Sequence, residues 1–330
     1  MKPLVSVVMS VFNEPERLAT TIESVLAQSY DRLELVIVND GSSDPGVGSI
    51  LSHFAASDPR VTIVEKKNEG LTLALIDACR AARGELIARI DSGDRMESAR
   101  IALQAALLSE SGECVLATSV TEFHGPEWEH LWFSPRPALL RGRPLRFEAD
   151  AAMAERAFDI THHGSVMFRR SSYEQCGGYR PQFYVGQDWD LWYRLGETGD
   201  FCAVSEVLYH ARIFPRSISM EQAGRQREIA ECSLGAAKAR AGRADEGPWL
   251  DRAAAIRPMN DSSARRASAE PGFYFVGEAL RRNGDPACRR YLADAVRERP
   301  LSLRSWVRLV QSLTLSSNSR QGRAGKGRRG

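Results

Sequence analysis

The sequence predicts an α/β fold with a largely parallel sheet. Residues 5–10 (VSVVMS) and 33–38 (LELVIV) are mainly apolar runs, which is typical of parallel strands that are buried on both faces. Each run ends in polar, turn-forming residues, FNE after the first and NDGSSD after the second. Ligands of such folds bind at the carboxyl ends of the strands, so we expect a site where these two runs end.

The next elements continue the β–α alternation. A helix is predicted from about Pro15, which suits a first helical turn, and a second helix opens at Asp44 and the proline that follows it. Residues 61–64 form a third strand, a third helix ends at Gly84, and residues 86–90 form a fourth strand. Four successive β–α units favour a largely parallel sheet.

The pattern is weaker after residue 118. We expect a long loop over residues 124–144, a strand over 165–168 and a short helix over 188–195. The predicted domains are an α/β domain over 1–220, a helical extension over 221–315 with a break near 258–268, and a disordered basic tail over 316–330.

Composition excludes several classes of protein. The 330 residues carry a net charge of +2, which gives no argument for a nucleic-acid partner, and we expect none. The six cysteines are scattered, so we expect reduced thiols rather than a zinc site or a disulfide framework. A predicted core strand starts close to Met1, so we expect no signal peptide, and no apolar stretch is long enough to span a bilayer. We therefore expect a cytoplasmic protein, with peripheral contact at the inner membrane face left open.

Acidic residues are the candidates for holding a nucleotide, because neither glycine-rich phosphate motif is present after these strands. Asp40, after the second strand, could accept a hydrogen bond from a base or a ribose, or it could be a turn residue. Asp91 and Asp94, after the fourth strand, could hold a divalent cation on phosphate oxygens. The alternative for Asp94 is the cap of a helix over residues 96–108.

Two further positions could carry chemistry. Asp188 could act as a general base toward a hydroxyl, or it could be an N-cap of its helix. His162 and His163 could bind phosphate, a metal or an acceptor, or they could be polar loop residues before a strand.

Five motifs in order along the chain resemble those of the family 2 glycosyltransferases of the GT-A fold. They are VSVVMSVFNE, VIVNDGSSD, GELIARIDSGDRM, HHGSVMFRR with CGGYR, and GQDWDLWYRL, and the resemblance covers about residues 4–220. It implies a GT-A fold and an inverting reaction, in which a metal-bound nucleotide-sugar donor gives its sugar to an acceptor hydroxyl.

The resemblance also implies roles for individual residues. Asp188 would be the catalytic base, and Asp94 would bind Mg²⁺ or Mn²⁺. The residues implied to bind the nucleotide are Val11, Phe12, Glu14, Asp40, Asp91 and Ser92. The candidates for contact with acceptor or phosphate are His162, His163, Gln187, Trp189, Arg212 and Arg216.

Three positions depart from the pattern of that family. Gly93 stands where an aspartate usually binds the metal, so Asp94 becomes the candidate ligand. Gln187 replaces a common glutamate and keeps a hydrogen-bonding group. Phe214 stands where many members have histidine, so an arginine (Arg212 or Arg216) would take over the phosphate contact.

The expected function is therefore a glycosyltransferase of the hexosyltransferase type (EC 2.4). It would transfer a sugar from a UDP-, GDP- or dTDP-sugar to a glycan or lipid-linked glycan, as in bacterial surface polysaccharide biosynthesis. Two alternatives are a degenerate, non-catalytic nucleotide-sugar-binding protein and a sugar-nucleotide pyrophosphorylase. The second would need a glycine-rich, basic loop after the first strand, where this chain has Phe12, Asn13 and Glu14.

Overall fold

The computed structural model describes residues 2–134, 145–147, 162–216, 223–257 and 269–315. Contacts between residues divide the chain into two compact units. The first comprises Met1–Glu122, Phe133–Ala211 and Gly224–Pro258, and the second comprises Phe123–Trp132, Arg212–Ala223 and Met259–Gly330. Each unit is described by itself below.

The first half of the sheet confirms the predicted fold class. Its four strands are parallel neighbours in the order β3-β2-β1-β4. Their bounds are Val5–Val11 (β1), Leu33–Asp40 (β2), Val61–Lys66 (β3) and Leu86–Arg89 (β4). Both β1 and β2 are buried along almost their whole length, as their apolar runs predict.

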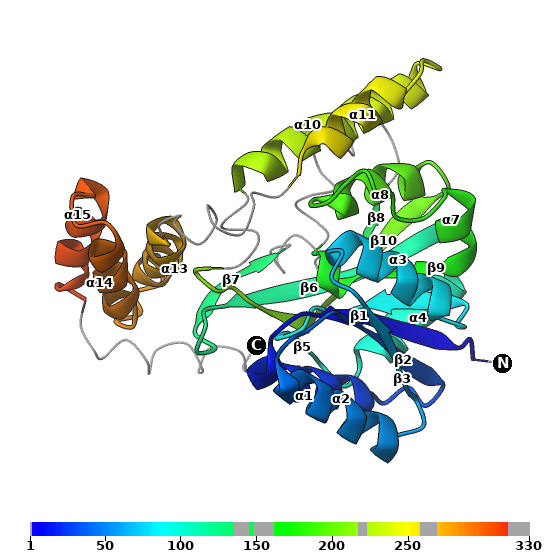
Figure 1. The fold of residues 1–330 in the computed structure, drawn as a ribbon, viewed down its shortest axis with the longest axis horizontal. Coiled ribbons are helices and arrows are strands. Elements are labelled where there is room, and N and C mark those ends of the chain that lie inside the picture. Colours follow the sequence, from blue (N-terminus) through cyan, green and yellow to red (C-terminus); the bar gives the residue numbers. More distant parts are fainter. Residues whose placement is uncertain (1, 135–144, 148–161, 217–222, 258–268, 316–330) are drawn as a thin grey trace, which may run out of the picture. The chain divides into compact units, whose positions relative to one another are not determined.

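The predicted helices lie between these strands. Their bounds are Pro15–Leu26 (α1), Pro45–Ser57 (α2), Leu71–Ala81 (α3) and Arg100–Glu110 (α4). Proline occupies the first turn of α1 and α2, and the Asp44 carboxylate caps α2 by accepting the Gly46 N–H (2.8 Å). Figure 1 shows α1 and α2 on the opposite side of the sheet from α3.

The second half of the sheet is antiparallel. Strand β9 joins β4 to β6, and the order continues through β10 to β5. The bounds are Arg95–Met96 (β5), Cys114–His124 (β6), Met167–Arg169 (β9) and Asp200–Arg212 (β10). Two shorter strands, β7 (His130–Ser134) and β8 (Leu145–Phe147), pair with β6 and β10.

The prediction of a long loop over residues 124–144 is therefore wrong for the start of this segment. Residues 130–134 form β7, because the β6 edge provides backbone groups with which a short strand can pair. Residues 135–144 lie outside the described part of the chain.

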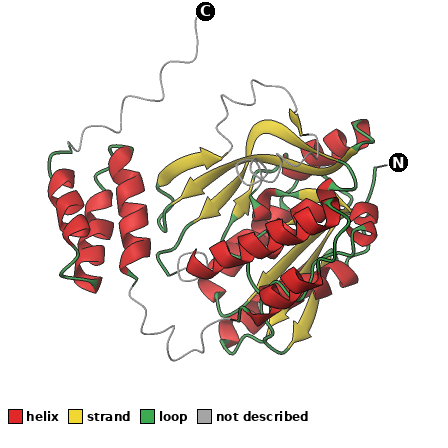
Figure 2. Ribbon diagram, turned by 90° about the horizontal axis from the view of Figure 1, so that it is seen from above, coloured by secondary structure: helices red, strands yellow, loops and turns green. Residues whose placement is uncertain are grey.

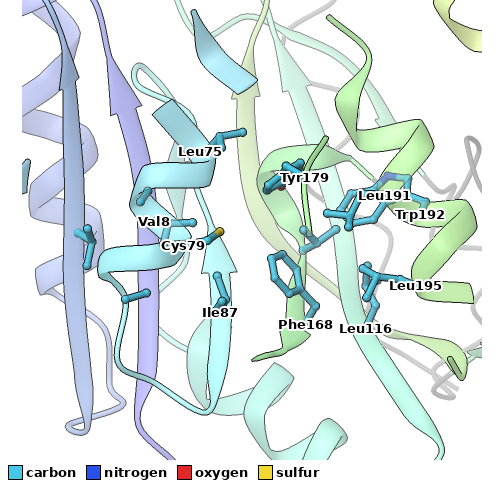
Figure 3. Close-up of a cluster of buried hydrophobic side chains, with 14 of the residues drawn as sticks. Val8, Leu75, Cys79, Ile87, Leu116, Phe168, Tyr179, Leu191, Trp192 and Leu195 are labelled. Carbon is cyan, nitrogen blue, oxygen red and sulfur yellow. The ribbon is translucent and has the colours of Figure 1, made fainter. Parts of the chain in front are cut away.

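The core beside the site is formed by two helices on one face of the sheet. Helix α8 (Gln187–Gly196) supplies Leu191, Trp192 and Leu195, which lie close to Leu116 and Phe168 in Figure 3. Helix α3 supplies Leu75 and Cys79 to the same cluster. This packing holds the first turn of α8, and with it Asp188, against the sheet. Between β9 and α8 the chain forms α7 (Arg170–Gln175).

One pair of cysteines corrects the expectation that all six are reduced. Cys114 on β6 and Cys202 on β10 form a disulfide, whereas Cys79, Cys176, Cys232 and Cys288 are free. The two residues are 88 positions apart in the sequence and become neighbours only because β6 and β10 are adjacent in the sheet.

Helices α10 (Ala223–Ala241) and α11 (Gly247–Ala255) group with the first unit. Ile229 and Ala253 pack in a buried cluster with Phe183 and Val185, which precede α8. The Arg180 guanidinium also donates to both carboxylate oxygens of Glu246 (2.9 and 2.8 Å). We predicted a separate extension from residue 221; these contacts instead join residues 224–258 to the unit that contains the sheet.

The second unit contains three consecutive helices, shown side by side in Figure 2. They are α13 (Glu270–Arg282), α14 (Cys288–Glu298) and α15 (Leu303–Ser312). Val276, Leu280 and Leu292 are fully buried between them. The predicted break near 258–268 and the predicted tail over 316–330 lie outside the described residues. None of the helices in the described ranges is long and apolar enough to cross a bilayer.

Candidate active site

The loops that follow β1 and β2 are tied together by Asn13. Its side-chain oxygen accepts the N–H groups of Ser43 (2.8 Å) and Asp44 (3.0 Å), and its own N–H donates to Ser42 Oγ (3.1 Å). Asn13 has a φ of 53°, in the left-handed region that asparagine tolerates better than most residues. The turn leaves the preceding Phe12 48% exposed at the carboxyl edge of the sheet, beside the buried Val11.

Asp40 is buried at the end of β2 and organises the loop before α3. Its two carboxylate oxygens accept the N–H groups of Glu69 (3.0 Å) and Gly70 (2.9 Å). Gly70 has a φ of 93°, and a Cβ there would meet the Tyr184 ring at 2.7 Å, so glycine is needed. Each carboxylate oxygen retains a second lone pair, so Asp40 combines this turn role with capacity to bind a ligand.

A tyrosine joins the two aspartates that follow β4. The Asp91 N–H donates to Tyr209 Oη (3.0 Å), and the Tyr209 hydroxyl donates to Asp94 Oδ2 (2.7 Å). Burial, together with the charges of Asp94 and Asp91, raises the Tyr209 pKa well above its usual value, so the hydroxyl stays protonated and remains a donor. Tyr209 on β10 therefore links the backbone of Asp91 to the carboxylate of Asp94.

Gly93 lies between these aspartates for a backbone reason. Its φ is 95°, which strongly favours glycine, and its N–H donates to Thr21 Oγ1 (2.9 Å). Thr21 in turn donates to the Asp94 carbonyl (2.8 Å), which fixes the turn against α1. An aspartate at position 93 would be strained in this turn, so the departure from the family pattern has a local cause.

The two capping alternatives considered from sequence are wrong. Helix α4 begins at Arg100, because residues 95–96 pair with β10 as β5, so Asp94 caps no helix. Helix α8 has Gly186 as its N-cap, with a φ of 64°, so Asp188 lies inside the first turn. Asp94 is therefore not at a helix end, and Asp188 is not the capping residue of α8.

Arg89 is a fully buried cation at the end of β4. Its guanidinium forms an ion pair with the Asp91 carboxylate. Burial alone would raise the Asp91 pKa, but the charge and hydrogen bond of Arg89 hold that pKa below its usual value. Asp91 is therefore ionised at neutral pH and can bind a cation or a ribose hydroxyl.

His162 joins these aspartates in a group with the chemistry of a metal site. One ligand atom from each of Asp91, Asp94 and His162 lies within 4.8 Å of the other two. Burial lowers the His162 pKa to about 4, with Arg89 and Arg100 acting in the same direction, so the imidazole is neutral near pH 7. Two carboxylates and a neutral imidazole fit a divalent ion such as Mn²⁺.

The adjacent His163 has a different environment. Its Nε2 is 2.7 Å from the Tyr179 hydroxyl, and its ring meets Trp192 edge-on. Burial also lowers its pKa well below the usual value. His162 and His163 begin a short 3₁₀ turn (η1, His163–Ser165), which directs one imidazole to the aspartates and the other to the core.

Asp188 has the pKa of a general base that operates near neutrality. Burial, with a further contribution from the charge of Asp91, raises the Asp188 pKa to about 6. Arg89 opposes this shift, so Asp188 is within electrostatic range of both members of the Arg89–Asp91 pair. By contrast, Asp190 is fully buried and paired with Arg194.

The remaining predicted residues of the first unit fall in two places. Glu14 lies near Ser92 and Asp91; burial raises its pKa, while the charge of Arg17 acts in the opposite direction. Gln187 is buried in the first turn of α8, and Trp189 packs partly against the core cluster. The structure thus brings the loops after β1 and β4 together.

Arg212 and Arg216 belong to the second unit and have their own contacts there. The Arg212 guanidinium lies over the rings of Trp128 (4.6 Å) and Phe214 (5.1 Å). Arg216 forms an ion pair with Glu298 (2.7 Å). Their role toward phosphate stays a prediction.

Sequence reasoning missed three residues that organise the site. Arg89 was visible as a lone charge in the apolar run of β4, LIAR. Tyr209 and Arg100 gave no comparable signal, because their roles depend on strand and helix packing. The Arg100 guanidinium lies over the Tyr209 ring (5.0 Å) and donates to the Val166 carbonyl (3.1 Å).

A sheet with parallel order 3-2-1-4, with carboxylates at the carboxyl ends of its strands, is typical of a nucleotide-binding α/β enzyme. The model of the family "Glycosyl transferase family 2" matches residues 6–177. The chain therefore belongs to glycosyl transferase family 2, which leaves the pyrophosphorylase alternative without support.

Curated relatives agree with this assignment. The putative glycosyltransferase EpsE of Bacillus subtilis is 32% identical over 220 residues, which cover 64% of this chain and 73% of EpsE. The amylovoran biosynthesis glycosyltransferase AmsE of Erwinia amylovora is 28% identical, covering 59% of this chain and 70% of AmsE. Other relatives are much longer: the chain spans 23% of an uncharacterized Sinorhizobium fredii protein, y4gI, over 65% of its own length at 29% identity.

Solved structures confirm the GT-A fold. The mannosyltransferase PcManGT from Pyrobaculum calidifontis, in complex with GDP-Man and Mn²⁺, aligns with a TM-score of 0.54 at 19% identity. The alignment covers 95% of this chain and 85% of PcManGT. At this identity the similarity establishes the fold of the protein and not its substrates.

Proposed function

We propose that this glycosyltransferase is an inverting hexosyltransferase that moves a sugar from a nucleotide-sugar donor to a hydroxyl of a glycan or lipid-linked glycan. The observation that carries the proposal is the grouping of Asp91, Asp94 and His162, with Asp188 within range of the charge on Asp91. A cation site near a carboxylate of raised pKa suits the transfer of a sugar from a diphosphate donor to a hydroxyl.

In the proposed donor site, the edge of the parallel strands holds the nucleoside. Phe12 would stack on the base, and Asp40, held by the loop before α3, would accept a hydrogen bond from it. Asp91 would contact the ribose, together with Val11, Glu14 and Ser92 of the surrounding loops. Asp91, Asp94 and His162 would hold Mg²⁺ or Mn²⁺, which would supply positive charge for the leaving diphosphate.

The proposed reaction is a single in-line displacement. The acceptor oxygen forms a bond to the anomeric carbon while Asp188 takes the proton of that hydroxyl. The bond from the anomeric carbon to the donor phosphate oxygen breaks, and its electron pair leaves with the nucleoside diphosphate. Attack opposite the leaving group inverts the anomeric centre. His163, Gln187 and Trp189 stay candidates for the acceptor side, and Arg212 or Arg216 for the phosphate.

The substrate class and the cellular location also belong to the proposal. AmsE is named for amylovoran biosynthesis, and PcManGT was solved with GDP-Man and Mn²⁺, which supports a UDP-, GDP- or dTDP-sugar donor and an acceptor in surface polysaccharide biosynthesis. We place the protein in the cytoplasm, where sugar nucleotides are made.

A nucleotide screen tests the proposed function. Thermal melting would be recorded with UDP, GDP, dTDP and CDP, each with Mn²⁺ and with a chelator. We expect at least one diphosphate to raise the melting temperature only with Mn²⁺, and the matching sugar nucleotide to be slowly hydrolysed. Metal-dependent binding with neither hydrolysis nor transfer would instead support a non-catalytic nucleotide-sugar-binding protein.

A further inference from the structure

Helix α15 is oriented with its polar side inward. Ser305 is fully buried, and its hydroxyl donates to the Glu270 carboxylate on α13 (2.6 Å). Ser302, at the N-cap, donates to the same carboxylate (3.0 Å), and Ser312 at the other end is also fully buried. The helix is therefore anchored to the second unit by these small polar side chains together with Leu309, which packs against the buried cluster of that unit.

The opposite side of α15 is apolar and exposed. Leu303, Trp306 and Val310 follow each other at spacings of three and four residues and are 80%, 46% and 59% exposed. With their neighbours they form one surface, which we call the α15 face: Leu301, Leu303, Trp306, Val307, Val310 and Leu313. A contiguous apolar patch of this kind marks a site of interaction, unlike isolated exposed side chains.

The charge of the chain changes sharply at this helix. Residues 299–330 contain eight lysines and arginines and no acidic residue, so this segment carries a charge of +8. All 42 acidic residues precede Arg299, together with 36 of the 44 basic ones, so residues 1–298 carry −6. Two of these eight residues, Arg304 and Arg308, lie on α15, and five follow it in the sequence between positions 320 and 329.

Arginines border the α15 face at the surface. Arg304 is paired with Glu270 (2.6 Å) and lies over the Tyr274 ring (4.7 Å), while its guanidinium remains about half exposed. Arg308 is one turn further along, 3.4 Å from Glu278. Leucine, valine and tryptophan on one side with arginines at the margin are typical of helices that lie in a membrane interface.

We propose that the α15 face docks on an anionic lipid bilayer surface. Trp306 is suited to the interface because its ring is exposed while its indole N–H is already bonded to the Pro300 carbonyl (2.8 Å). A second copy of the chain fits less well, since pairing two α15 faces would bring two +8 segments together. An anionic surface instead attracts each basic residue near it.

This inference does not rest on the proposed sugar transfer. It concerns residues 299–330, none of which we assign to donor binding or base catalysis, and its measurement is lipid binding. Protein that binds vesicles but transfers no sugar would therefore refute the proposed function alone, and the reverse result would refute this inference alone.

Co-sedimentation of the full chain with vesicles tests the proposal. Vesicles of phosphatidylcholine alone would be compared with vesicles that also contain phosphatidylglycerol, at low and high salt. We expect binding to the anionic vesicles, weakened by salt. The double variant Trp306→Gln and Val310→Gln should reduce this binding by about tenfold or more, because two apolar side chains no longer enter the interface.

The matched control is Phe275→Gln, which removes another exposed aromatic side chain of the second unit and should leave vesicle binding unchanged. If the double variant fails to fold, Leu303→Gln replaces it, since that side chain has little packing to lose. The proposal is overturned if the wild-type protein ignores anionic vesicles, or if it binds both kinds equally. Unchanged binding by the variants, or a wild-type dimer in sedimentation velocity that they dissociate, would also overturn it.

Discussion

Two aspartates on the first turn of α8 show how surroundings decide the role of a residue. Asp190 is buried against Arg194 and also faces Arg180 (3.6 Å), so its charge is compensated and its role is structural. In the described part of the chain, no salt bridge reaches Asp188, whose pKa is raised to about 6. In the sequence, both are acidic residues at the start of one helix. Only their surroundings in the structure distinguish their roles.

Replacing Asp188 by asparagine should abolish most sugar transfer and leave nucleotide binding within a few-fold of wild type. Loss of a positioned general base costs about 10²–10⁴ in rate. Transfer rates and nucleotide titrations on the same protein preparation measure the two effects. As a contrast, Asp190→Asn should lower the melting temperature, because Arg194 would lose its buried partner. An Asp188→Asn enzyme with more than a tenth of wild-type activity would reject Asp188 as the base.

The pH dependence of transfer should show the raised pKa of Asp188. The base must be deprotonated, and burial shifts its pKa upward from 3.8 to about 6, so the rate should fall as the pH drops through about 6. Single-turnover rates at saturating donor would measure this acidic limb. The residual activity of Asp188→Asn serves as the control and should lack the limb. A limb near pH 4 would contradict the assignment.

Variants of the adjacent residues His162 and His163 provide a matched test of the proposed metal site. His162→Ala should weaken Mn²⁺-dependent nucleotide binding by about 10–100-fold, the range found when a site loses a group that supports its metal. His163→Ala should leave metal dependence unchanged but lower the melting temperature, because the Tyr179 hydroxyl loses its buried partner. Nucleotide titrations with and without Mn²⁺ decide between them. Equal effects of both variants on metal dependence would remove His162 from the metal group.

At the scale of elements, the site depends on where β10 crosses the sheet. Tyr209 reaches Asp91 and Asp94 only because β10 pairs with β5, which directly follows the Asp94 turn. Gly164, in the turn before β9, allows this approach, since a Cβ there would lie 2.1 Å from Tyr209 Oη. Close packing of the Gly164 backbone against the Tyr209 hydroxyl thus supports the turn that carries both aspartates.

Gly164→Ala should therefore disturb the site without removing any ligand. The added methyl group would displace Tyr209, and we expect Mn²⁺-dependent nucleotide binding to fall by about tenfold. Gly112→Ala is the matched control, because a Cβ there would meet no atom within 4 Å. Titration of nucleotide at fixed Mn²⁺ compares the two. Wild-type affinity in a folded Gly164→Ala protein would show that Tyr209 does not set the metal group.

At the scale of the whole molecule, the two units divide the proposed tasks. The first contains the residues proposed to bind the nucleoside and the metal and to act as base, together with α10 and α11. These two helices cover Phe183 and Val185 and hold Arg180 through Glu246. The second unit presents the α15 face. Removal of residues 259–330, the largest segment of the second unit, should therefore separate nucleotide binding from lipid binding.

Truncation after Pro258 should keep metal-dependent nucleotide binding and lose vesicle binding. Truncation after Ser219 should instead give an unstable or insoluble protein, because removal of α10 and α11 exposes the apolar cluster before α8. Melting curves, nucleotide titration and vesicle sedimentation compare the two products. A folded Pro258 truncation without nucleotide binding would mean that the second unit helps to form the donor site.

The sequence alone determined the parallel half of the fold and the edge of the sheet at which the candidate site lies. The runs of β1, β2 and β4 are apolar because both faces of these strands are buried, and turn residues mark their carboxyl ends. The five motifs also identified the family. These features are local in sequence, so periodicity and spacing are enough to predict them.

The tertiary structure decided what depends on contacts between distant residues. Strand pairing brings Cys114 to Cys202 and Tyr209 to Asp94, and folding places His162 beside Asp91. The charge of Arg89 keeps the buried Asp91 ionised. Burial, together with the charge of Asp91, raises the pKa of Asp188. The sequence also could not predict that Trp306 on α15 is exposed. An amphipathic pattern shows that a helix has an apolar side, but it does not show which side faces the core.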